Sequence, residues 1–118
     1  MTAENTRYRD LTQDISRHLA TLRADQPEMM KGFGDLARAA GKDGVLDKKT
    51  KELIGVALSV AARCDPCIGF HVQSFVKLGG SKAELEEVLG MAVYMGGGPS
   101  LMYAAKTLAA FEEFAATA

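Results

Sequence analysis

The spacing of apolar residues is the feature that most restricts the fold of this 118-residue chain. No segment alternates apolar and polar residues with a period of two over a length that would predict a β-strand. Apolar residues instead recur at intervals of three and four, which is the spacing of one face of an α-helix. The pattern therefore predicts an all-α fold, a single-domain bundle of about six helices that covers residues 1–118.

Turn and capping residues predict where these helices begin and end. After a first helix at residues 6–24, a D-x-x-E capping box at Asp25 is expected to open a second helix, which Gly41 ends. Asp47 is the predicted N-cap of a third helix at residues 48–63. The remaining helices are expected from residue 64 or 65 to residue 78, at residues 82–95 behind a Ser81-x-x-Glu84 capping box, and at residues 100–115.

Two groups of apolar residues are expected to be buried. The helix at residues 48–63 is rich in Leu, Ile, Val and Ala, which implies that it lies deep in the protein. Met91, Met95 and Met102 form a methionine-rich set that we expect to fill irregular space in the core, with the wall of a substrate pocket as the alternative. His18 lies beside the apolar stripe of the first helix and is expected at or near the surface.

Both cysteines lie in the segment ELIGVALSVAARCDPCIGFH, residues 52–71. On a helix that begins at Cys64 or Asp65, the side chains of Cys64, Cys67 and His71 share one face, because they are at positions i, i+3 and i+7. The imidazole can therefore reach a thiol. A helix N-terminus also stabilises a thiolate, and a thiol pKa lowered from about 8.5 towards 7 would make roughly half of the thiol ionised at neutral pH.

Glu52 lies on the preceding predicted helix, where a buried carboxylate needs a partner. His71 would supply one directly, and Cys67 would supply one through a water molecule. A carboxylate in such a position is suited to passing protons. The residues thus predict a redox dithiol in which Cys67 attacks and Cys64 resolves, with the opposite order as the alternative because Cys64 is nearer the helix end.

The constellation of Glu52, Cys64-Asp65-Pro66-Cys67 and His71 resembles the core motif of the alkylhydroperoxidase D family, within the carboxymuconolactone decarboxylase-like superfamily. The resemblance extends over residues 36–114 and includes the run G-G-S-x-x-E-L-E-E-V at residues 79–88. It implies an all-helical oligomer with thiol-dependent peroxidase or disulfide reductase activity in antioxidant defence. The catalytic residues that it implies are Glu52, Cys64, Cys67 and His71. Some members have a histidine between the cysteines, where this chain has Asp65-Pro66.

Two alternatives to the dithiol are a zinc site on the same residues and a decarboxylase from the same superfamily. Zinc could be bound by Cys64, Cys67 and His71 with Glu52 as the fourth ligand, although ligands on one helix face are unusual for a structural site. A decarboxylase acting on a cyclic lactone acid is the other alternative, but that enzyme does not use a cysteine pair. Covalent haem attachment is excluded because Ile68, not histidine, follows Cys67. The dithiol interpretation requires neither a cofactor nor a metal.

Charge and hydropathy restrict location and partners. The net charge of −1 and the absence of a long Lys/Arg cluster argue against nucleic-acid binding. No segment has the 18 or so apolar residues of a membrane span, and no signal peptide is evident, so we expect a cytoplasmic protein. The expected partners are a hydroperoxide or disulfide substrate, a thiol or dithiol reductant protein, and further copies of the chain in a trimer or hexamer.

Overall fold

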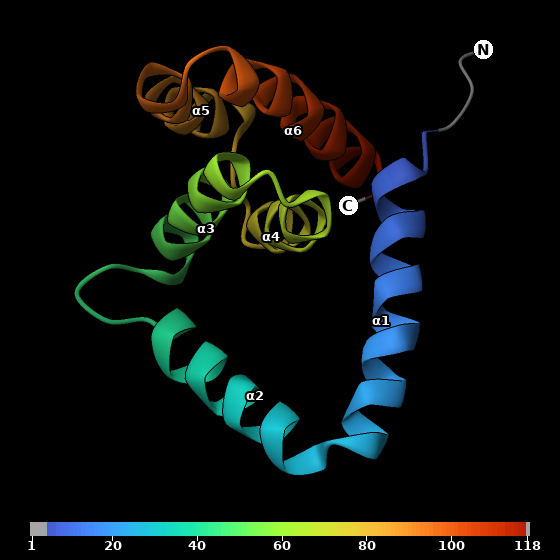
Figure 1. Ribbon diagram of the computed structural model, residues 1–118. Helices are drawn as coiled ribbons and strands as arrows, with labels where there is room; N and C mark the ends of the chain where they lie inside the picture. The colour runs from blue at the N-terminus through green and yellow to red at the C-terminus, as the bar shows by residue number, and fades with distance from the viewer. Residues whose placement is uncertain (1–4, 118) are drawn as a thin grey trace.

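The computed structural model of the chain describes residues 5–117, which form six α-helices (Figure 1). In chain order they are α1 (Arg7–Asp25), α2 (Pro27–Gly41), α3 (Lys48–Ala62), α4 (Asp65–Lys77), α5 (Lys82–Gly96) and α6 (Gly98–Ala116). The described residues contain no β-strand. The predicted all-α class and number of helices are confirmed. Within the same residues, no helix is both long and apolar enough to cross a membrane.

Two of the predicted N-caps, Asp47 and Ser81, are confirmed by side-chain hydrogen bonds, whereas α6 begins at Gly98, two residues before the predicted start. The Asp47 side chain accepts the backbone N–H of Thr50, and both hydrogen bonds of the Ser81–Glu84 capping box are present. The capping box predicted at Asp25 is wrong. Asp25 is the last residue of α1, and the N-cap of α2 is Gln26, whose side chain makes no capping hydrogen bond in the described chain. Pro27 begins α2 instead, since its fixed φ suits a first helical position.

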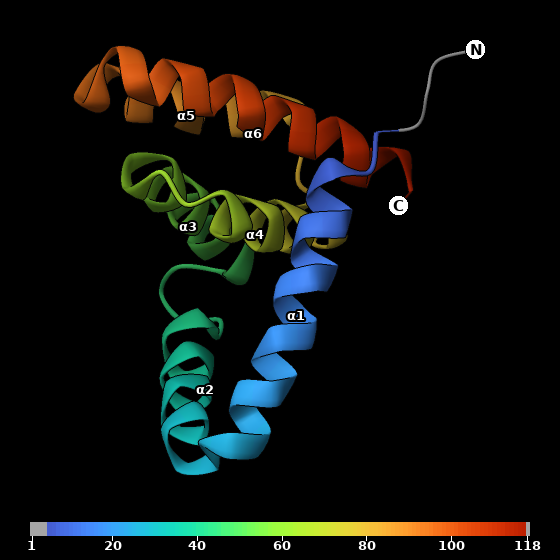
Figure 2. The same ribbon diagram turned by 45° about the vertical axis from the view of Figure 1, so that its right-hand side comes forward.

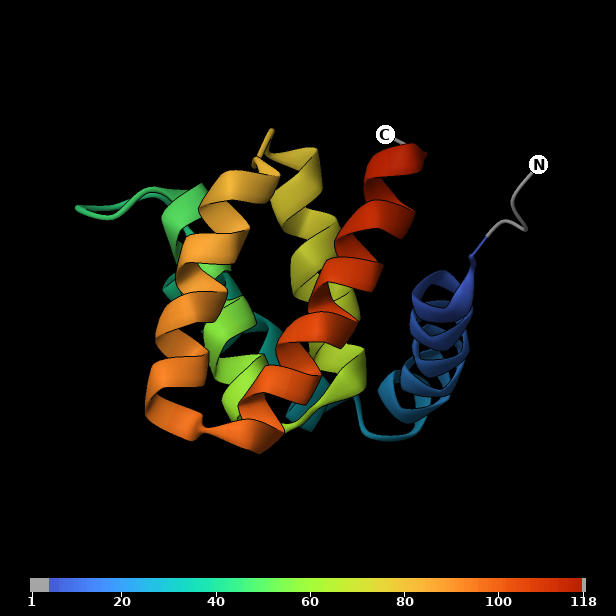
Figure 3. The same cartoon turned by 90° about the horizontal axis from the view of Figure 1, so that it is seen from above.

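Helices α3 to α6 form a four-helix core, residues 48–116. Each of them packs against two neighbours in the cyclic order α3, α4, α6, α5. Seen from above, α5 and α6 lie side by side over α3 and α4, while α1 stands to one side (Figure 3). Helices α1 and α2 form a V-shaped extension, here called the α1–α2 arm, residues 7–41 (Figure 2). Within residues 5–117, α2 contacts only α1 and α3.

The interior is formed by one apolar cluster, to which the arm contributes Tyr8. The ring of the buried Phe75 lies 6.4 Å from that of Phe111, a partly buried residue that packs against the cluster. Gly80 closes the turn after α4 directly on Phe75, where an added Cβ would lie 2.2 Å from the ring, so only glycine fits there. The other buried members are Val56, Val60, Ile68, Val72, Leu85, Leu89, Ala104, Ala110 and Phe114.

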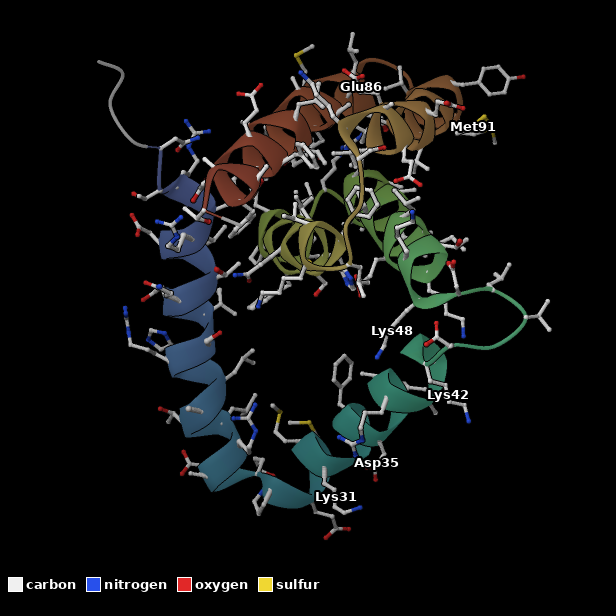
Figure 4. All side chains as sticks on the ribbon, turned by 180° about the vertical axis from the view of Figure 1, so that it is seen from behind. Lys31, Asp35, Lys42, Lys48, Glu86 and Met91 are labelled. Atoms are coloured by element: carbon white, nitrogen blue, oxygen red, sulfur yellow. A yellow bond between two sulfur atoms is a disulfide. The ribbon has the colours of Figure 1, made fainter. Side chains whose placement is uncertain are left out.

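Two expectations about burial are wrong. Helix α3 is buried on one side only, because Val56 and Val60 are enclosed whereas Leu58 is 64% exposed. The three methionines do not fill the core: Met91, Met95 and Met102 are at least 60% exposed, and Met91 points outward from α5 in Figure 4. The apolar face of α2 is exposed as well, with Phe33 66% exposed. Apolar spacing thus identified the faces of these helices but not whether the chain itself covers them.

Candidate active site

The cysteine pair lies at the beginning of α4. Cys64 is the N-cap, and its sulfur accepts the backbone N–H of Cys67 at 3.3 Å. Cys64 and Cys67 form a disulfide, with their Cα atoms 5.2 Å apart. The amide at this helix end and the positive end of the helix dipole both favour negative charge on Cys64 when the pair is reduced.

A tight turn between α3 and α4 brings the helix that carries Glu52 next to the helix that carries His71. Arg63 adopts the left-handed conformation with φ 56°, and the N–H of Cys64 donates to the carbonyl of Ser59 at 3.1 Å. As a result α4 folds back along α3. The helices approach closely at Gly55, where an added Cβ would lie 3.0 Å from Nδ1 of His71.

His71 and Glu52 form a hydrogen bond between Nδ1 and Oε2 at 2.8 Å. Because an ionised carboxylate only accepts, Nδ1 is the donor, and Nε2 is left free to exchange a proton with another group. This hydrogen bond raises the pKa of His71 above its ordinary value, against the opposing effect of burial. The His71 side chain remains 43% exposed, so it is open to solvent and to a small ligand.

The four residues predicted from the sequence therefore lie on two adjacent helices as two bonded pairs. Glu52 contacts His71 directly, which is the first of the two partners expected for it. Cys67 and His71 are one turn apart on α4, a spacing that places their Cβ atoms about 5–6 Å apart. Among residues 5–117, no three His, Cys, Asp or Glu side chains are grouped so that they could hold a metal ion. The zinc alternative thus lacks a ligand set in this arrangement.

Sequence reasoning missed a second polar cluster at the same helix start. Asp65, between the cysteines, accepts hydrogen bonds from the Tyr8 hydroxyl at 2.9 Å and from Nζ of Lys106 at 3.0 Å. These partners are 57 and 41 residues away in the chain, so no local spacing could reveal them. The available signal was the acidic residue itself, which adds negative charge where a thiolate is expected.

Comparison with known proteins identifies the family. The sequence model described as the carboxymuconolactone decarboxylase family matches residues 27–110. The chain belongs to this family. The predicted family is thus confirmed, and the matched range includes the cysteine pair, Glu52 and His71 but not Tyr8.

Solved structures of carboxymuconolactone decarboxylase family proteins resemble the chain over most of its length. One from Legionella pneumophila is 60% identical, with a TM-score of 0.93 over 94% of this chain and 99% of that one. One from Thermotoga maritima is 32% identical, with a TM-score of 0.78 over 86% and 87%. An uncharacterized protein of Cupriavidus necator is 41% identical over 84% of this chain and 88% of its own length.

Proposed function

We propose that this family member is a thiol-dependent peroxidase or disulfide reductase that cycles the Cys64–Cys67 pair. The observation that carries the proposal is a CxxC disulfide at a helix start, one turn from an imidazole that a carboxylate orients. The Thermotoga maritima relative has a suggested involvement in an antioxidative response, which agrees with this chemistry. The substrates would be hydroperoxides or disulfides in antioxidant defence, and a thiol or dithiol protein would be the reductant.

In the peroxidase cycle, Nε2 of His71 takes the proton of the Cys67 thiol. The thiolate attacks a hydroperoxide, the O–O bond breaks, and Cys67 becomes a sulfenic acid while the alkoxide leaves and is protonated to an alcohol. The Cys64 thiolate then attacks the sulfenic sulfur, which forms the disulfide and releases water. An external dithiol donates two electrons and two protons to restore the pair.

One structural feature supports the proposed role of each cysteine. Cys67 is one turn from His71 and so has the nearer base, which favours it as the attacking thiol. Cys64 accepts the amide at the helix end, which favours its thiolate as the resolving nucleophile. Glu52 holds the tautomer of His71 and stabilises the imidazolium that forms.

Matched serine variants test this function and the order of the cysteines. Cys64→Ser should accumulate a trappable sulfenic acid at Cys67 when treated with hydrogen peroxide, whereas Cys67→Ser should react slowly. Rapid trapping at Cys64 in the Cys67→Ser protein would reverse the roles. A wild-type pair that stays reduced in excess peroxide, and that does not accelerate disulfide reduction either, would overturn the proposed function.

Lactone decarboxylation, the reaction in the family's name, receives less support from this site. The site presents two sulfurs that form a disulfide and, one turn along α4, a histidine that is hydrogen-bonded to a carboxylate. Thiol redox chemistry uses all four residues, whereas the decarboxylase alternative gives no role to the cysteines.

We also propose that a second copy of the chain covers the α1–α2 arm. The arm has an apolar cleft of about 730 Å³ between its helices. The chain exposes 7593 Å², whereas a compact monomer of 12.6 kDa would expose about 6,200 Å². The difference exceeds the roughly 800 Å² that each partner contributes to a standard interface. The residues that line the cleft include Leu19, Leu22, Met29, Met30 and Phe33.

Light scattering tests this interface. The wild-type protein should form an oligomer, and Phe33→Asp should reduce its mass, because the charge would be buried at the interface. Glu28→Gln on the same helix is the control, with an unchanged mass expected. A monomer mass for the wild-type protein would contradict the proposal.

A further inference from the structure

Asp65 separates the two cysteines and is held by side chains from two other helices. From α1, the hydroxyl of Tyr8 donates to Oδ1, and from α6, Nζ of Lys106 donates to Oδ2. Tyr8 is only 1% exposed. The ammonium of Lys106 also lies 4.6 Å from the ring centroid of Tyr103, which adds a cation–π interaction and restricts its position. The beginning of α4 is therefore bonded to both α1 and α6.

The carboxylate of Asp65 is a negative charge beside the redox sulfurs. Burial would raise the pKa of this carboxyl, but the hydrogen bonds from Lys106 and Tyr8, with the charge of Arg7, lower it below its ordinary value. Asp65 is thus ionised at neutral pH. Burial, and then the hydrogen bond to Asp65, raise the pKa of Tyr8, so its hydroxyl stays protonated and donates.

This charge acts on the cysteine next to it. Asp65 follows Cys64 directly, so its carboxylate lies within the Debye length of about 10 Å at 0.1 M salt. A negative charge at that distance disfavours the thiolate and hence the reduced pair. The ammonium of Lys106, bonded to the same carboxylate, offsets that effect.

We propose that Asp65, Tyr8 and Lys106 are positioning residues that set the charge beside Cys64 and thereby the thiol–disulfide equilibrium of the pair. The inference rests on the proposed function and adds a tuning element that is built from three helices. In the equilibrium with glutathione, the protein disulfide accepts two electrons and two protons from two glutathione thiols, which become glutathione disulfide. Any stabilisation of the Cys64 thiolate favours the reduced pair.

The two charged partners should therefore act in opposite directions. Asp65→Asn removes the negative charge and leaves that of Lys106, so the equilibrium should move about threefold towards the dithiol, or about 14 mV. Lys106→Met leaves the carboxylate without its cation and should move the equilibrium by a similar factor towards the disulfide. Tyr8→Phe keeps the buried ring, removes one donor and should act in the same direction as Lys106→Met. The Asp65→Asn/Lys106→Met double variant should return towards wild type.

The experiment is a glutathione redox titration of the full chain, with acid quenching, thiol alkylation and mass spectrometry. Lys31→Met is the matched control, because Lys31 forms a similar pair with Asp35 on α2, away from α4 (Figure 4). Circular dichroism checks that each variant is folded, and Lys106→Gln replaces Lys106→Met if the latter is not.

Opposite shifts for the Asp65 and Lys106 variants, with no shift for Lys31→Met, would support the inference. Shifts in the same direction would indicate only that the helix start had been loosened, and they would overturn it. Shifts no larger than that of Lys31→Met would overturn it too, while a normal wild-type titration would leave the proposed function intact. A wild-type pair that does not titrate would overturn both.

Discussion

Helix α2 has the most strongly amphipathic sequence of the six helices, yet none of its 15 described residues is buried. Helix α4 is less amphipathic and nevertheless buries Ile68, Gly69, Val72 and Phe75. The difference lies in what surrounds each helix. Helix α4 is enclosed by α1, α3 and α6, whereas α2 contacts only α1 and α3 within the described residues.

The residues of the candidate site are concentrated in one of the two regions. Every residue of the candidate site except Tyr8 belongs to the four-helix core, where neighbouring helices restrict side-chain positions. The proposed redox cycle needs its base and its thiols at fixed separations, which the packed helices of the core provide. The α1–α2 arm instead offers an apolar surface, which suits association.

The largest difference is expected when a phenylalanine is replaced by alanine in each of the two regions. Phe75→Ala should lower the free energy of unfolding by about 3–5 kcal/mol, because it leaves a cavity in the core. Phe33→Ala, on the exposed face of α2, should mainly weaken the proposed assembly. Urea unfolding and light scattering would separate these outcomes. An equal loss of stability in dilute protein would show that the arm packs within its own chain as firmly as the core.

A smaller effect is expected at the junction of the regions. Glu113 of α6 is buried and accepts the backbone N–H groups of Tyr8 and Arg9, at 3.0 and 2.7 Å. Glu113→Ala should cost about 1–3 kcal/mol, because those amides are left without their acceptor. Glu112→Ala, at its exposed neighbour, is the control. Hydrogen exchange should show faster exchange at the start of α1 than in α4, and equal acceleration throughout would contradict a local junction.

Helix caps should differ between the regions as well. In the four-helix core, Ser81→Ala at the start of α5 should cost about 1 kcal/mol, because it removes the hydrogen bond that caps this helix. Gln26→Ala at the start of α2 should change stability by no more than about 0.5 kcal/mol, since the Gln26 side chain caps nothing in the described chain. Chemical denaturation of both variants checks this. A comparable loss for Gln26→Ala would indicate a contact made by the arm in the proposed assembly.

The smallest effect on stability concerns the His71–Glu52 pair and its dependence on pH. Because the folded-state pKa of His71 is raised, the pair stabilises the fold most below the unfolded pKa of about 6.5, and this contribution disappears as the pH rises through the folded pKa. Glu52→Gln should lower that pKa and remove the pH-dependent contribution, whereas Glu28→Gln in the arm should not. Titration of the His71 ring by NMR measures both. An unchanged pKa in Glu52→Gln would contradict the assigned hydrogen bond.

The sequence by itself determined the local features of this protein. Helix periodicity predicted the class and the six helices, and capping residues predicted the starts of α3 and α5, because these depend on interactions within a few residues. The shared face of Cys64, Cys67 and His71 follows from the same helical geometry. The Asp25 capping box failed because the turn between α1 and α2 begins one residue later than the local motif implied.

Only the tertiary structure decided which apolar faces are covered and which distant side chains meet. His71 was one of the two partners expected for the Glu52 carboxylate, and the packing of α3 on α4 brings it into contact. The contacts of Asp65 with Tyr8 and Lys106 depend on three helices converging at one point. The exposed methionines and the exposed face of α2 have the same explanation. Burial of an apolar residue against any apolar surface is favourable. The position of the residue in the sequence therefore does not say which surface, or which copy of the chain, covers it.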